Sequence, residues 1–192
     1  MSSGYAFTGN SQLKFAVRDY LWDDPAAIAT YGDISTWDVS RITDFSHLFQ
    51  SQGTFNSDIS NWDVSSGTNF RWMFHGASTF NQDIGSWDVS SGTDFDSMFK
   101  RAYAFNQDIG RWNVSSGTDF SWMFSSAWAF NQDIRSWDVS SSSNFRYMFA
   151  YADAFNQNIG NWQVNHASVW KMFTGADLML SNQGFSATPT SA

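Results

Sequence analysis

The sequence contains no cysteine and few basic residues. Without cysteine the chain forms no disulfide, no cysteine-ligated zinc site and no catalytic thiol, and its redox compartment stays open. Its 10 lysines and arginines stand against 18 acidic residues and give a net charge of -8. Because an acidic surface repels phosphate backbones, this charge argues against a nucleic-acid partner.

Long apolar runs are missing as well. No stretch approaches the ~18 apolar residues of a transmembrane helix, so we expect no transmembrane segment. The opening residues, MSSGYAFTGN, show neither the basic nor the apolar region of a secretory signal peptide. The localisation stays open between a cell or particle surface and a peripheral position in a large complex.

The motifs of common catalytic centres are also missing. His47, His75 and His166 fall at unrelated places in the chain, whereas a catalytic triad or a zinc site needs side chains that converge. We therefore expect them at the surface. No serine lies in a nucleophile-elbow context, and there is no glycine-rich phosphate loop. The sequence predicts a protein that is not an enzyme and holds no cofactor.

Aromatic residues, by contrast, are abundant and periodic. They make up 19% of the chain, which weighs against disorder. Tryptophan recurs every 25 residues, at Trp37, Trp62, Trp87, Trp112, Trp137 and Trp162. Valine, phenylalanine, methionine and isoleucine recur in register with it, and a fixed period of this length is the signature of a repeat array.

One unit, SWDVSSGTDFDSMFKRAYAFNQDIG from Ser86, predicts the local structure. Trp87 and Val89 lie two residues apart and share one face of an extended segment. After a turn at SSGT, Thr93 or Asp94 can cap a helix. The helix is indicated by apolar residues at helical spacing: Phe95, Met98, Phe99 and Ala102. The chain then returns through Phe105 and Ile109 to the next unit.

No unit can bury its apolar side chains alone, so the units must stack. We predict an α/β repeat solenoid of the leucine-rich-repeat-like kind, with one short parallel strand and one short helix per 25-residue coil. Strands stack about 4.8 Å apart and helices about 8–10 Å apart, so the stack should bend. The predicted regions are an N-terminal helical cap (1–31), a solenoid of about six coils (32–176) and a C-terminal cap and tail (177–192).

The helical cap rests on its own pattern. In SQLKFAVRDYLW, apolar residues stand at helical spacing, and Pro25 suits the first position of a second helix. We therefore expect one or two short helices within 11–31, covering the open end of the first coil.

The columns F-N-Q-D-I-x-x-W-D-V-S-x-x-T-D-F-x-x-M-F, over about 32–176, resemble a known family. They are similar to the bacterial surface-protein 26-residue repeat of Mycoplasma-type lipoproteins, grouped with BspA-like leucine-rich repeats. The usual unit has methionine where this chain has the phenylalanine before x-x-M-F, and S-N-V-T in place of S-S-G-T. The opening LKFAVRDYLWDDPAAIATYGDISTWDVS is similar to the lead-in of algal and large-virus repeat proteins. The resemblance implies a surface, adhesion or protein-interaction role and no catalytic residues.

Two aspartate columns are candidates for a metal site. One holds Asp38, Asp63, Asp88 and Asp138, and a second holds Asp33, Asp58, Asp83, Asp108 and Asp133. Stacked carboxylates suggest calcium ligands. Asn113 and Gln163 interrupt the first column, however. A role in accepting hydrogen bonds from turn amides accounts for both columns. We favour the structural role and predict no metal site.

Function in a repeat array should lie where the units differ. Two variable columns carry large aromatic residues outside the inward stripe, and neighbouring positions add more. The candidate partner-binding residues are Trp72, Tyr103, Trp122, Trp128, Tyr147, Tyr151 and Trp170. Exposed aromatic clusters mark interaction surfaces, but packing between coils could cover the same side chains. Both interpretations stay open at this point.

These observations lead to one expected function and one alternative. The first is a non-enzymatic repeat scaffold that binds another protein, as an accessory or structural subunit of a larger assembly or as a surface protein. The alternative is a carbohydrate-binding surface adhesin that uses its aromatic faces against sugars, with calcium on the aspartate columns.

Overall fold

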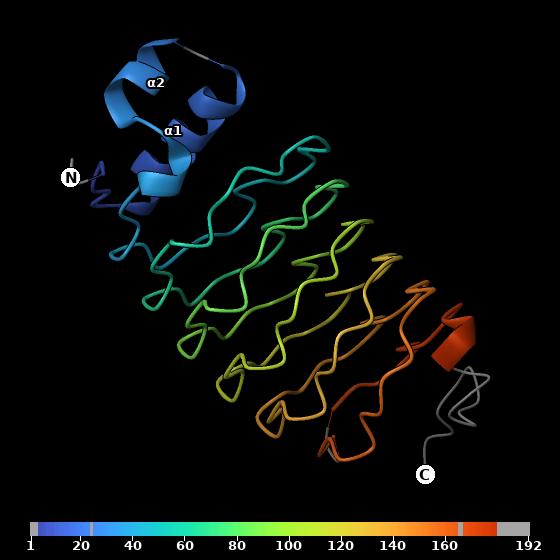
Figure 1. Ribbon diagram of the computed structural model, residues 1–192. Coiled ribbons are helices and arrows are strands. Elements are labelled where there is room, and N and C mark those ends of the chain that lie inside the picture. Colours follow the sequence, from blue (N-terminus) through green and yellow to red (C-terminus); the bar gives the residue numbers. More distant parts are fainter. Residues whose placement is uncertain (1–3, 24, 165–166, 180–192) are drawn as a thin grey trace.

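The computed structural model describes residues 4–23, 25–164 and 167–179, and it places two helices at one end of a stack of similar coils (Figure 1). The elements are α1 (Asn10–Leu21), α2 (Pro25–Tyr31) and the 3₁₀-helix η1 (Ile34–Thr36), with a further helical turn at 177–179. None of the helices in the described residues is long and apolar enough to cross a membrane.

The helices predicted within 11–31 are present. In α1 the apolar spacing buries Leu13, Ala16 and Val17 against the core. Helix α2 begins at Pro25, whose fixed φ and missing N–H suit the first position of a helix. Asn10 and Lys14 tie α1 to the first coil: the Asn10 side chain accepts the backbone N–H of Thr43, and Lys14 lies 2.7 Å from a carboxylate oxygen of Asp44.

Successive coils are joined by parallel hydrogen bonding at one point of the repeat. Single-residue parallel bridges connect equivalent residues of neighbouring coils: Asp44 to Asn69, Asn69 to Asp94, Asp94 to Asp119, Asp119 to Asn144 and Asn144 to Ser168. The step is 25 residues until the last pair, which is one residue shorter because the final unit lacks a residue. Each bridge is one residue long, and the Trp87–Val89 segment forms no strand.

The predicted helix of each coil is not formed. Within residues 95–102, the φ angles of Ser97 and Arg101 are 56° and 60°, in the left-handed region that an α-helix excludes. The backbone instead makes consecutive turns. Met98 donates to the carbonyl of Phe95, while the N–H groups of Ser97 and Arg101 donate to the next coil at 2.8 and 2.9 Å. Alternate amides thereby join the coils, which an α-helix could not allow, since it uses its amides internally.

Because the helix does not form, the capping role expected of Thr93 is wrong, and the reason given for a bend no longer holds. Thr93 caps no helix, because its hydroxyl donates to the backbone carbonyl of Thr68 in the preceding coil, 3.1 Å away. The bend was expected from a mismatch between strand and helix spacing, and that mismatch does not arise where neither element forms. The wider class of α/β, leucine-rich-repeat-like solenoid stays a prediction.

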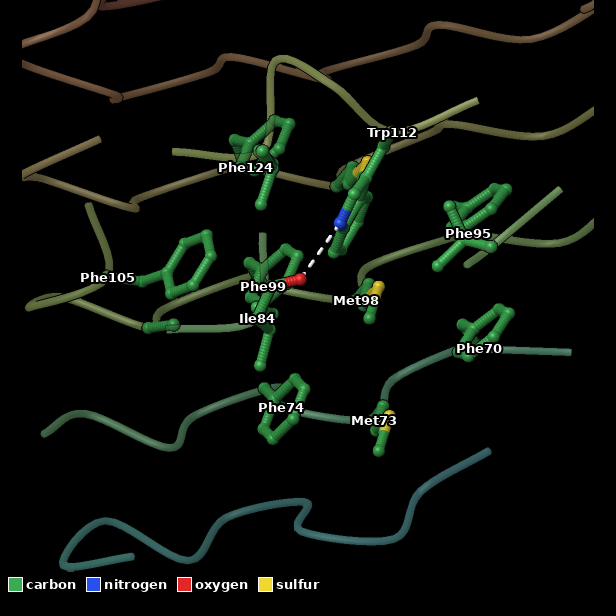
Figure 2. Packing of buried hydrophobic residues seen from close by; sticks show 14 of the residues in the cluster. Phe70, Met73, Phe74, Ile84, Phe95, Met98, Phe99, Phe105, Trp112 and Phe124 are labelled. Carbon is green, nitrogen blue, oxygen red and sulfur yellow. Dashed lines mark hydrogen bonds between the residues drawn. The ribbon is translucent and has the colours of Figure 1, made fainter. Parts of the chain in front are cut away.

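The core consists of the side chains that the repeat places inward. In the unit from Ser86 these residues are between 0% and 4% exposed: Trp87, Val89, Phe95, Met98, Phe99, Ala102, Phe105 and Ile109. The rings of Phe74, Phe99 and Phe124 stack coil upon coil, with centroids 5.5 and 5.7 Å apart (Figure 2). A turn-based coil with i, i+3, i+4 spacing therefore buries the same stripe that a helix would bury.

Candidate functional site

The first variable column occupies a special backbone position. His47, Trp72, Ser97, Trp122, Tyr147 and Lys171 all have positive φ, between 55° and 61°. Each is the third residue of a four-residue turn, in which the N–H of the fourth residue donates to the carbonyl of the first. A type II turn places its third residue in the left-handed region. The side chains that vary most in the repeat thus stand at a fixed, repeated backbone geometry.

Rings in this column contact one another between coils. Trp122 stacks on Tyr147 with centroids 4.0 Å apart, and Tyr147 meets Trp170 edge-on at 4.9 Å. Trp72 is flanked by His47 at 5.5 Å and by His75 at 4.5 Å. Trp72, Trp122 and Tyr147 are therefore half-buried by their neighbours.

A second aromatic group lies in the segment that follows the turns. Tyr103 stacks on Trp128 with centroids 4.0 Å apart, and Trp128 is 50% exposed. Tyr151 is 53% exposed and covers Gly175, where an added Cβ would lie 2.5 Å from its ring. The variable aromatics thus stack between coils, and Trp128 and Tyr151 are also exposed; their use as a partner-binding surface stays a prediction.

Basic side chains lie over several of these rings. The Lys100 ammonium lies 3.7 Å from the centroid of Trp122. Arg146 and Lys171 lie 4.9 and 4.6 Å from Trp170. Cations over aromatic faces are attracted by the ring quadrupole. The aromatic surface thus carries positive charge although the chain as a whole is acidic.

Between Trp72 and Trp122 lies a cleft of about 430 Å³ with a polar floor. Asp96 is 7% exposed, and its carboxylate accepts the indole N–H of Trp72 at 2.9 Å and lies 3.2 Å from the Arg71 guanidinium. The Ser97 hydroxyl donates to its other oxygen at 3.0 Å, and the Ser121 hydroxyl lies 3.0 Å from that oxygen and 2.6 Å from Oδ1 of Asp119. Asp96 is therefore fully engaged and holds Trp72 in place.

Burial alters the titration of groups around the cleft. It raises the pKa of Asp94, with the nearby Asp119 and Asp96 carboxylates adding to the effect. It lowers the pKa of Lys100, assisted by the charge of Arg101. His75 is half-buried rather than at the surface, its Nδ1 has no hydrogen-bond partner, and burial lowers its pKa.

The sequence indicates Trp72 and Trp122 as candidates but does not reveal the cleft between them. Asp96, Ser97 and Lys100 stand in columns whose residues change from unit to unit, so no single change in them signals a cleft without the structure. The available sign was that the unit with the small Ser97 is also the unit with Asp96, so both changes fall on one coil.

The aspartate columns act as turn caps. The Oδ1 atoms of Asp38, Asp63, Asp88 and Asp138 each accept the backbone N–H of the serine two residues later, at 3.0–3.1 Å. Hydrogen bonds from the Ser40 and Ser90 hydroxyls and amides hold the pKa values of Asp38 and Asp88 below their usual range. Within the described ranges, no group of three or more histidine, cysteine or acidic residues is placed to hold a metal ion.

An asparagine ladder runs along another corner. The Oδ1 atom of each residue accepts the backbone N–H of its counterpart in the next coil at 2.9 Å, from Asn56 through Asn81, Asn106, Asn131 and Asn156. Gln107 and Gln132 donate to the preceding asparagine carbonyl as well. The ladder joins neighbouring coils, and it ends at Asn156, whose buried Oδ1 has no partner among the described residues.

Comparison with known proteins gives one family match. The model of the family described as "Mycoplasma protein of unknown function, DUF285" matches residues 23–127 and again residues 93–185. No curated protein and no solved structure matches the chain. The two overlapping matches span the helical segment from residue 23 and all of the repeats.

Proposed function

Because the chain belongs to this family of Mycoplasma-type repeat proteins, we propose that it is a non-enzymatic solenoid scaffold that binds another protein. It would serve as a structural or accessory subunit of a larger assembly, or as a surface protein. We also propose that the chain is related to the BspA-like leucine-rich repeats and to the repeat proteins of algae and large viruses.

The observation that carries the proposal is the exposed, stacked pair Tyr103–Trp128. Its rings lie 4.0 Å apart and Trp128 is 50% exposed. Tyrosine and tryptophan offer large contact areas with few rotatable bonds, and for this reason they are enriched among the residues that dominate protein interfaces. Stacking fixes the pair in advance, so a partner would lose little entropy in binding it.

The separation of buried, constant columns from outward, variable columns supports the role of a scaffold. The inward columns carry the fold, and the variable columns can change without disturbing it. A surface of this kind accommodates a partner by exchanging residues at fixed backbone positions, as other repeat proteins do along their exposed faces.

The test is a capture experiment with matched variants. The full chain is immobilised and exposed to extract from its source, and bound proteins are quantified by mass spectrometry. The chosen variants are Trp128→Ala on the proposed site and Arg111→Ala as a control, since Arg111 is exposed in a different segment of the repeat.

We expect one protein that the wild type and Arg111→Ala retain and that Trp128→Ala loses, and that binds the chain again when both are purified. Equal retention by all forms, with each variant folded by circular dichroism, would show that the proposed surface is wrong.

The alternative function, a carbohydrate-binding surface adhesin, is favoured by the cleft between Trp72 and Trp122. Calcium dependence is the weaker part of that alternative, because the Oδ1 atoms of the aspartate column already accept turn amides.

A further inference from the structure

We infer that the cleft between Trp72 and Trp122 binds one ring of a neutral sugar. The inference goes beyond the protein-binding proposal and is independent of it, since that proposal rests on Tyr103 and Trp128, which do not line the cleft.

The width of the cleft follows from the repeat. In the core of the same three coils, the ring of Phe95 fills the space between Phe70 and Phe120, with centroids 5.5 and 5.2 Å away. Two residues further along the chain, the outer positions are Trp72, Ser97 and Trp122. The small Ser97 leaves room between the two tryptophans for the Lys100 side chain, whose ammonium lies 3.7 Å from the centroid of Trp122 and must move aside for a ring to enter.

The floor of the cleft is rigid before any ligand binds. Ser97 is 2% exposed and Asp96 7% exposed, and both belong to the hydrogen-bond network that holds the indole of Trp72. Small-molecule sites are typically preformed, lined by apolar and aromatic groups, and given orientation by a few polar side chains. The volume of about 430 Å³ lies within the range of roughly 300–1,000 Å³ common for such sites.

The charges around the cleft restrict the ligand. The lining holds two basic side chains, Arg71 and Lys100, and two acidic ones, Asp96 and Asp119, so neither sign of charge predominates. An aromatic side chain of a partner would bury Lys100 without giving it a hydrogen-bond acceptor, which is costly. A neutral ring with many hydroxyls avoids that penalty and can form hydrogen bonds with side chains of both signs.

A pyranose ring also matches the chemistry of the walls. Its C–H faces are apolar and lie well against indole rings, while its hydroxyls can donate to the Asp119 carboxylate and accept from Arg71 and Lys100. Lys100 lies 3.7 Å from the centroid of Trp122 in the free protein. Its flexible stem lets the ammonium leave the ring face and bind a hydroxyl at the rim when a sugar stacks there.

To test the inference, we fill the cleft by placing at position 97 a tryptophan, the residue that the two neighbouring coils have at this position. Ser97→Trp places an indole at a left-handed position where Trp72 and Trp122 are native, so the fold should tolerate it. Arg111→Ala, at an exposed residue that does not line the cleft, serves as the matched control. Trp122→Ala removes one wall and provides a second loss-of-binding variant, and Trp128→Ala reports on the separate protein-binding proposal.

The labelled full chain is applied to an array of oligosaccharides of hexoses and N-acetylhexosamines, with sialylated and sulfated glycans alongside. We expect at least one neutral glycan to bind the wild type, Arg111→Ala and Trp128→Ala with similar affinity, with and without chelator. Ser97→Trp and Trp122→Ala should weaken that binding at least about tenfold.

Absence of any neutral glycan among the ligands would overturn the inference. So would preferential binding of charged glycans, or unchanged affinity in the folded Ser97→Trp or Trp122→Ala variant. A result in which Trp128→Ala loses the captured protein while glycan binding persists would support both proposals separately.

Discussion

The indole nitrogen of Trp112 donates a hydrogen bond to the backbone carbonyl oxygen of Ile84, 3.0 Å away in the preceding coil (Figure 2). The same bond recurs along the stack, at 2.8–3.2 Å, from Trp62 to Ile34, Trp87 to Ile59, Trp137 to Ile109 and Trp162 to Ile134. It explains why the column holds tryptophan, because phenylalanine and tyrosine rings bring no N–H donor and the smaller imidazole of histidine would not fill the same buried space.

The first prediction concerns this bond. Trp112→Phe keeps an aromatic ring but removes the donor and leaves space unfilled. A lost buried hydrogen bond costs about 0.5–1.5 kcal/mol, and the smaller ring adds a cavity penalty, so we expect a destabilisation of about 1–3 kcal/mol in urea unfolding. Trp128→Phe, at the surface, should change the free energy of unfolding by less. Equal losses would mean that the indole bond contributes nothing.

The second prediction concerns a second column of residues with positive φ, four residues after the first: Ser51, Gly76, Arg101, Ser126, Tyr151 and Gly175. Arg101 has φ of 60° and Gly76, its counterpart one coil earlier, has φ of 71°. Because a side chain is strained there, Gly76→Ala should destabilise the protein by about 1 kcal/mol, although its Cβ would meet only ordinary contacts at 3.5 Å.

The converse change is Arg101→Gly, which relieves the same strain. We expect it to be neutral or stabilising, whereas Lys100→Gly, one residue earlier at an ordinary φ, should cost about 0.5–1 kcal/mol. Thermal unfolding of the three variants measures the effect. If both glycine substitutions destabilise equally, the left-handed assignment is wrong.

The third prediction concerns acid. The pKa values of Asp33, Asp38 and Asp88 are lowered in the folded protein by hydrogen bonds from the serine two residues later. The resulting stability is present above the unfolded-state pKa of about 3.9 and is lost as the pH falls through the lower, folded-state values. The urea midpoint should therefore drop steeply below about pH 4. Asp94, with a raised pKa, acts in the opposite direction and offsets part of the drop.

A single substitution isolates the acid effect. Asp88→Asn keeps the Oδ1 acceptor, as Asn113 does in the next coil, where it accepts the Ser115 amide at 3.2 Å. We expect stability near that of the wild type at neutral pH and a shallower loss in acid. An unchanged slope would show that this carboxylate does not contribute to acid unfolding.

The fourth prediction separates the two interpretations of the aspartate columns. If these side chains are turn caps, millimolar Ca²⁺ or a chelator should leave the melting temperature unchanged, because a ligand that binds the folded state alone must raise it. A calcium-dependent rise in the melting temperature that disappears in Asp88→Asn would instead show that the aspartate column binds a cation.

The sequence was sufficient to predict the period, the inward residues and the helices at the N-terminal end. It misled on the middle of each coil because Phe95, Met98 and Phe99 have the same spacing on a helix and on a run of turns. What excludes the helix is the positive φ at Ser97 and its counterparts. Those counterparts include tryptophan, tyrosine and lysine, residue types that do not predict a left-handed backbone as glycine does. Only Gly76 and Gly175, in the second column of positive φ, indicate such a backbone.

The site shows a similar division. The outward position of Trp72 and Trp122 follows from the repeat, since they stand outside the buried stripe. The cleft does not, because it depends on what Ser97 fails to fill and on how Asp96 bonds to Trp72. Those relations join different coils, and a sequence shows them only once the stacking register is known.

The most direct test of the division between fold and binding face compares Trp112→Phe with Trp128→Ala. The affinity of the captured partner is measured for both variants under conditions where both are folded. We expect wild-type affinity with reduced stability for Trp112→Phe, and lost affinity with nearly wild-type stability for Trp128→Ala. Lost affinity in Trp112→Phe together with full affinity in Trp128→Ala would contradict this division.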